Sequence, residues 1–93
     1  GGRTLEAVAI RLSEVAISHQ VICVTHAAQI ASRADVHLLI EKKVLAGRTH
    51  TLTSRLSAEE RITEISRMLG GNTDSPVSRK HAIEMLERAR GQK

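Results

Sequence analysis

The chain has 93 residues, enough for one small domain that buries only about 60–65% of its unfolded surface. Hydrophobic residues make up 41% and none is aromatic, so any core is aliphatic and recognition of single-stranded nucleic acid by base stacking is disfavoured. The net charge of +4 is consistent with an ordinary basic surface or with binding to a polyanion such as nucleic acid or nucleotide phosphate. The single cysteine excludes an internal disulfide.

The first part of the chain predicts a helix followed by a buried strand. Residues 4–18 carry apolar side chains at helical spacing, and Gly1-Gly2 before them allows a tight turn. Residues 20–26 form an apolar, β-branched run without alternation, which is typical of a central strand in a parallel sheet. Helix and strand together are the second half of a βαβ unit whose first strand would precede residue 1. Because the chain also has no starting Met, we expect a segment of a longer protein.

The remainder predicts a short helix, a hairpin and two further helices. Residues 27–33 favour a two-turn helix, and strands at 36–45 and 48–56 flank Ala46-Gly47 as a hairpin turn. Ser57 and Glu60 form a capping box for a helix that ends at Gly70-Gly71. After a polar loop at 72–75, Pro76 fits the first position of a last helix.

His26 is the first functional candidate, because ligands of open α/β sheets bind beyond the carboxyl ends of the strands. The alternative is a histidine that only satisfies a structural hydrogen bond. Cys23, in the middle of the predicted strand, is expected to be a small buried apolar residue. A zinc site built from Cys23, His26, His37 and His50 is disfavoured, since their spacing matches no common ligand pattern.

Four runs of residues together make the chain recognisable. They are Gly-Gly-Arg-Thr at 1–4, Gln-Val-Ile-Cys-Val-Thr-His-Ala-Ala-Gln-Ile-Ala at 20–31, Glu-Lys-Lys at 41–43, and the stretch from Glu-Arg-Ile at 60–62 to Arg-Met-Leu-Gly-Gly at 67–71. With these runs the chain resembles, over essentially all its length, the C-terminal part of the RecN DNA-repair ATPases, which are SMC-like members of the ABC-type ATPases. One departure is Ala27-Ala28, where many members have Leu-Pro.

The resemblance implies an α/β fold: residues 1–93 would be the C-terminal fragment of an ABC/SMC-type ATPase head of P-loop NTPase fold, with a central parallel strand and an edge hairpin flanked by helices. Gly1 and Gly2 would be the nucleotide-binding end of the D-loop, and His26 the switch histidine that hydrogen-bonds the γ-phosphate of ATP. The ligands of Mg²⁺ and the phosphate loop would lie outside this chain. We therefore expect an ATPase part that is inactive as this fragment alone.

The implied partners are the N-terminal half of the same head, a second head in an ATP-dependent dimer, and DNA through the intact protein, with no membrane. The implied role is recombinational repair of DNA double-strand breaks in the bacterial cytoplasm, at the nucleoid. The alternative from another class is a stand-alone basic module that binds nucleic acid without nucleotide chemistry. Lys42, Lys43, Arg48 and Arg55 would then meet phosphates, although a solvated basic edge strand is the favoured explanation of these residues.

Overall fold

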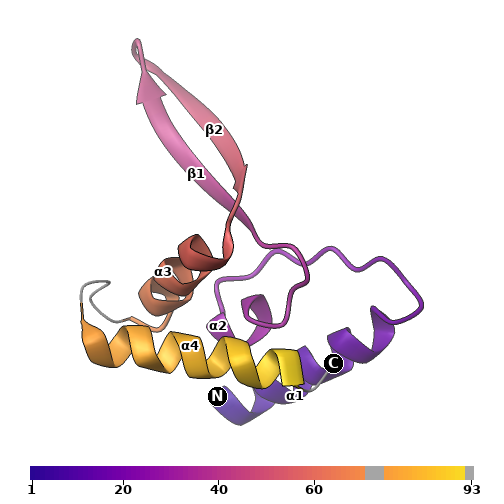
Figure 1. Ribbon diagram of the computed structural model, residues 1–93. Coiled ribbons are helices and arrows are strands. Elements are labelled where there is room, and N and C mark those ends of the chain that lie inside the picture. Colours follow the sequence, from indigo (N-terminus) through magenta and orange to yellow (C-terminus); the bar gives the residue numbers. More distant parts are fainter. Residues whose placement is uncertain (71–74, 92–93) are drawn as a thin grey trace.

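The computed structural model describes residues 1–70 and 75–91 and combines helices with one antiparallel strand pair. The elements in order are α1 (Gly2–Val15), α2 (Ala28–Ala31), β1 (Leu38–Leu45), β2 (Arg48–Arg55), α3 (Ala58–Met68) and α4 (Pro76–Gly91). Helices α1 to α4 form a layer from which the hairpin projects (Figure 1). The predicted helices and hairpin are confirmed, with ends that differ by a few residues. The polar loop predicted at 72–75 falls mostly outside the described residues.

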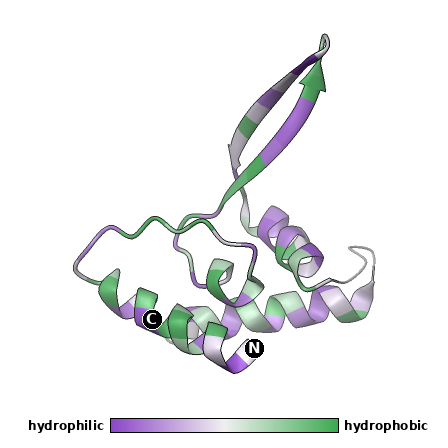
Figure 2. Cartoon of the chain, turned by 180° about the vertical axis from the view of Figure 1, so that it is seen from behind, coloured by the Kyte–Doolittle hydropathy of each residue, from purple (hydrophilic) through white to green (hydrophobic). Residues whose placement is uncertain are grey.

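The predicted buried strand at 20–26 is wrong for this chain by itself. Residues 20–27 have no regular secondary structure, and Ile22 and Val24 are 85% and 87% exposed. Cys23 is exposed too, which corrects its predicted burial. Figure 2 shows this loop between α1 and α2 as largely hydrophobic. The physical reason is that a strand needs neighbours for its N–H and C=O groups, and in the described residues β1 and β2 pair only with each other. The sheet here is therefore antiparallel, without the central parallel strand.

The hairpin has a regular register and a tight two-residue turn. Its pairs run from Leu38 opposite Arg55 to Leu45 opposite Arg48. Ala46 and Gly47 have φ values of 52° and 75°, the left-handed conformation that type I′ turns need at both central positions. Every strand residue except Leu39 is exposed. A two-stranded hairpin without a packed face is only marginally stable, so this one depends on its connection to the helices.

Helix α3 begins at the predicted capping box. The Ser57 hydroxyl accepts a hydrogen bond from the Glu60 N–H at 3.2 Å, and the Glu60 carboxylate accepts one from the Ser57 N–H at 2.9 Å. Beyond the C-terminal end of α3, Gly70 has a φ of 81°, a conformation that glycine adopts without strain. These local signals set where α3 begins and ends.

The core lies where α2, α3 and α4 meet, and it is built from small side chains. Ile65 is fully buried among Ala28, Ala31 and Ala82. One guanidinium ties two of these helices together, because Arg61 Nη2 on α3 donates to the carbonyl oxygen of Ala31 at 3.0 Å. Partly buried side chains complete the cluster: Ile62, Met68, Leu69, Met85 and Leu86. Since the core is lean, the chain has little stability to spare.

Candidate nucleotide-sensing site

The two predicted glycines begin helix α1. Gly1 caps the helix without a side chain, and its carbonyl oxygen accepts a hydrogen bond from the Leu5 N–H at 3.1 Å. Both Gly1 and Gly2 are exposed. The first N–H groups of α1 have no partner within the helix, as at any helix start, and no acidic side chain lies in this first turn. The start of α1 is therefore open to an outside partner.

His26 is exposed, and one local hydrogen bond spans its backbone. The Thr25 hydroxyl accepts a hydrogen bond from the Ala27 N–H at 2.9 Å, which bridges the backbone across His26. The next two residues, Ala27 and Ala28, are buried, whereas His26 itself is exposed. Among residues 1–70 and 75–91, no hydrogen bond or ion pair engages the imidazole. The His26 ring is therefore solvent-accessible in this chain.

The structure brings the start of α1 beside the segment that follows His26. A Cβ added at Gly2 would lie 3.9 Å from Gln29 Nε2, at the second position of α2. The two predicted segments therefore occupy one region of the molecule, although 23 residues separate Gly2 from His26 in the sequence. In the described part of the chain, no hydrogen bond joins the His26 ring to either glycine.

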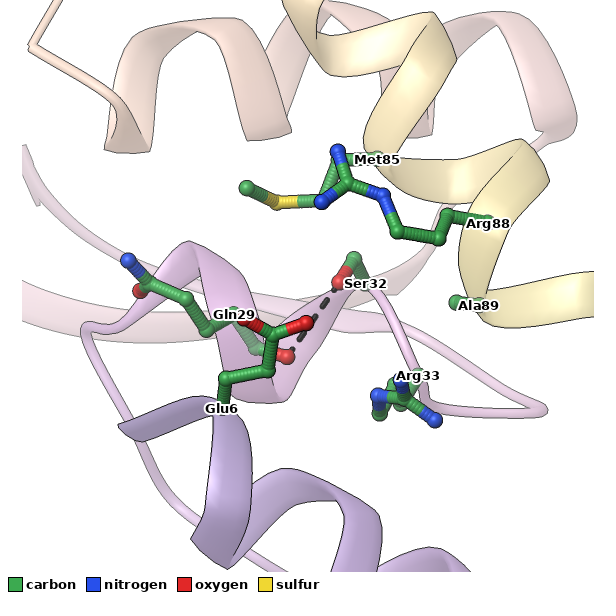
Figure 3. Close-up of a pocket in the computed structure, with 7 residues that line it drawn as sticks. All are labelled: Glu6, Gln29, Ser32, Arg33, Met85, Arg88 and Ala89. Atoms are coloured by element: carbon green, nitrogen blue, oxygen red, sulfur yellow. Dashed lines mark hydrogen bonds between the residues drawn. The ribbon is translucent and has the colours of Figure 1, made fainter. Parts of the chain in front are cut away.

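A small hollow lies on the same side, between α1, α2 and α4 (Figure 3). Its volume is about 40 Å³, room for a few water molecules and far less than a nucleotide needs. Ser32 closes one side and donates a hydrogen bond to the Gln29 carbonyl oxygen at 3.3 Å. The lining residues are Glu6, Gln29, Ser32, Arg33, Met85, Arg88 and Ala89. Because neither His26 nor the glycines line it, this hollow is not a nucleotide pocket.

A larger hollow of about 380 Å³ lies between α3 and α4, and sequence reasoning did not predict a role for Arg61, which lines it, or for His37. Arg61 lines it, and burial lowers the pKa of this guanidinium, while the Asp35 carboxylate opposes the shift. Burial, and then the charge of Arg61, lower the pKa of His37. The signal for Arg61 was its position four residues before Ile65, which places both side chains on the inward face of α3.

The residues present do not by themselves fit ATP with Mg²⁺. In the described ranges no group of three or more His, Cys, Asp or Glu side chains could hold a metal ion. An exposed imidazole and a helix start supply contacts for part of a phosphate group, but no cavity that would enclose it.

Over residues 1–70 and 75–91, no helix has the length and apolar character needed to cross a membrane.

Comparison with known proteins places this geometry in context. No family model matches the chain. The DNA repair protein RecN of Bacillus subtilis is 41% identical over 88 residues, which is 95% of this chain and 15% of that protein. This chain is similar to the C-terminal segment of RecN. The RecN of Deinococcus radiodurans is 49% identical over 86 residues, covering 92% of the chain and 15% of the relative.

The RecN of Mycobacterium leprae matches all 93 residues at 42% identity and 16% of its own length. The resemblance predicted from the sequence runs is therefore confirmed. The chain spans about 15% of the length of these RecN proteins. The activity of the whole RecN protein is therefore only proposed for this chain.

Proposed function

We propose that the chain is the C-terminal part of the ATP-binding head of a RecN-type protein that repairs DNA double-strand breaks by recombination. The observation that carries this proposal is 41–49% identity to proteins named DNA repair protein RecN across at least 92% of the chain. In this role the chain contributes His26 and the Gly1-Gly2 end of the D-loop to a nucleotide site completed by other segments.

The exposed imidazole suits the chemistry of this role. Enzymes catalyse phosphoryl transfer mostly by positioning groups and by stabilising charge on the transferred phosphate. His26 can donate one hydrogen bond to an anionic oxygen, and the Thr25–Ala27 hydrogen bond holds its backbone in place. Mg²⁺ and the remaining phosphate contacts must come from outside the chain, so these 93 residues alone are not expected to hydrolyse ATP.

The apolar loop supports the view that other segments complete the fold. Ile22 and Val24 are each more than four-fifths exposed, and burying one such side chain is worth about 2 kcal/mol. We propose that residues 20–26 become the predicted central strand when the N-terminal half of the same head pairs with them. A second head would complete the site in an ATP-dependent dimer, by way of Gly1 and Gly2.

A chimera tests the role of His26. In B. subtilis RecN the matching 88-residue segment is replaced by this chain, and steady-state ATP hydrolysis is measured with DNA present. His26→Ala is expected to lower kcat about 100-fold, the usual cost of removing one donor to developing charge. His19→Ala is the matched control, because His19 is exposed and its ring contacts only the neighbouring Ser18 hydroxyl at 2.9 Å. Equal turnover in the His26→Ala variant and the unsubstituted chimera would refute the assignment.

The stand-alone basic module makes a different prediction. Such a module would melt cooperatively by itself, whereas a head fragment with an exposed apolar loop should gain stability once the rest of the head is supplied. Thermal unfolding of the isolated chain, with and without the remaining part of B. subtilis RecN added in trans, separates the two. No change in midpoint on addition would favour the module.

A further inference from the structure

The positive charge of the chain is concentrated on the hairpin. Residues 38–55 contain Lys42, Lys43, Arg48 and Arg55 against the single acid Glu41, so they carry three of the four net positive charges of the whole chain. The rest of the chain is nearly neutral. Because Figure 1 shows the hairpin projecting from the helical layer, this charge lies at the end of an extended arm.

These cations are exposed and have no ion-pair partner. In the ranges 1–70 and 75–91, none of the salt bridges Arg11–Glu14, Glu64–Arg67 and Glu59–Arg79 involves a hairpin residue. No hydrogen bond to a hairpin side chain is present there either. The hairpin cations are therefore available to an external anion without first breaking a contact within the chain.

The register places most of the hairpin's cations in its outer half, near the turn. Leu38, Leu39 and Ile40 lie in the half next to the helices, opposite residues 53–55. Lys42, Lys43 and Arg48 lie in the outer half, near the turn. The outer half also carries the exposed Val44 and Leu45, and Arg55 lies at the base opposite Leu38. The two halves therefore differ in net charge, since the outer half has three cations and no acid whereas the base has Arg55 and Glu41.

The outer half presents charge on both of its faces. Side chains of directly opposed residues share a face, so Lys42 lies with Thr51 on one face and Lys43 with His50 on the other. Thr49 and Thr51 add exposed hydroxyl donors beside Lys42. A strand of eight residues is about 26 Å long. A two-stranded ribbon of this kind fits the major groove of B-DNA, which is about 12 Å wide with phosphates along both walls.

We propose that the outer half of the hairpin, residues 42–51, binds the phosphate backbone of duplex DNA. Lys42 and Lys43 contact phosphates from opposite faces of the ribbon, and Arg48 does so beside the turn. This inference rests on the DNA-repair role proposed above and adds the surface that performs it. It does not depend on His26 or on ATP.

DNA binding without nucleotide tests the inference. Fluorescence anisotropy of a labelled duplex of about 30 base pairs is measured with the full chain from about 50 to 200 mM NaCl. Three phosphate contacts predict a slope of log K against log salt of about −2.7, or about 40-fold weaker binding across this range. The variant Lys42→Gln, Lys43→Gln, Arg48→Gln is expected to bind at least about tenfold more weakly at 100 mM, with most of that slope lost.

Two control variants test whether a loss of DNA binding comes from the hairpin itself, from the lower net charge or from misfolding. Lys80→Gln, Arg88→Gln, Arg90→Gln removes the same charge from exposed positions of α4 and is expected to bind within about twofold of the unsubstituted chain. Lys42→Arg, Lys43→Arg, Arg48→Lys keeps the charge and should retain binding. Far-UV circular dichroism verifies the helices of each variant, and the same substitutions in the B. subtilis chimera repeat the test in a complete protein.

Two results would overturn the inference: unchanged affinity in the hairpin triple-glutamine variant, or an equal loss in the α4 variant. Binding to vesicles of anionic phospholipid is measured in parallel. If the hairpin triple-glutamine variant loses more affinity for these vesicles than for the duplex, this would also count against DNA as the partner. His26→Ala should leave DNA binding unchanged. Failure of the hairpin proposal therefore shows in anisotropy, and failure of the nucleotide proposal shows in ATP turnover.

Discussion

Two isoleucines in opposite environments test the packing described above. Ile65 is fully buried among alanines, and Ile22 is 85% exposed. Replacing Ile65 by Ala removes three buried carbons, which is worth about 2.4 kcal/mol in transfer free energy. The alanines cannot fill the space left, and the flexible Met68 and Met85 beside the cluster fill only part of it, so the residual cavity raises the cost in unfolding free energy to about 4 kcal/mol. Ile22→Ala deletes the same atoms from an exposed site and should cost less than about 0.5 kcal/mol.

Urea unfolding followed by circular dichroism at 222 nm measures both costs in the isolated chain. A loss of about 4 kcal/mol corresponds to a fall in Tm of more than about 15 °C for a domain of this size. In the B. subtilis chimera, Ile22→Ala should become costly as well, by about 2 kcal/mol or more, because the proposed strand would then be buried. Equal costs for the two substitutions in the isolated chain would contradict the packing. A negligible cost of Ile22→Ala in the chimera would contradict the proposed strand.

Two further predictions concern α3 and the segment before β1. Ser57→Ala removes the acceptor for the Glu60 N–H and should lower the unfolding free energy by about 1 kcal/mol, measured by urea unfolding; an unchanged midpoint would mean that the cap contributes nothing. For His37, burial and then Arg61 lower the pKa below its ordinary value of 6.5, so the folded state favours the neutral ring. The stability contributed by the neutral His37 ring is present above pH 6.5. It is lost as the pH falls from 6.5 through the lower pKa of His37 in the folded state, because the unfolded chain protonates His37 first. Thermal melts from pH 7.5 to about 5 should show this decline, and His37→Gln should flatten it.

Local signals in the sequence were sufficient for elements that depend on local contacts. The Ser57–Glu60 box marks the start of α3 because both of its hydrogen bonds join residues three apart. Ala46-Gly47 marks the hairpin turn because a two-residue connection between strands needs left-handed backbone, and the structure has it at both positions. Neither feature requires any other part of a protein.

The strand predicted at 20–26 could not be settled from composition, since a strand exists only together with its neighbours. Val24 and Ile22 have the right side chains, but the described residues offer them no adjacent strand. The exposure of Cys23 follows from the same cause. His26 is exposed, although the strand whose carboxyl end was to carry it is not formed, and its role in nucleotide chemistry stays a prediction. Arg61 and His37 were missed because their burial depends on how α2, α3 and β1 meet in space.

The hydrogen bond from Arg61 to the end of α2 has a mechanical consequence. Helix α2 is a single turn that begins two residues after His26, and it is too short to bend within itself. Arg61 Nη2 holds its last carbonyl groups, those of Ala31 at 3.0 Å and Ser32 at 3.4 Å. The segment that directly follows the imidazole is thus attached to α3 both by this guanidinium and by the packing of Ala28 and Ala31 against Ile65.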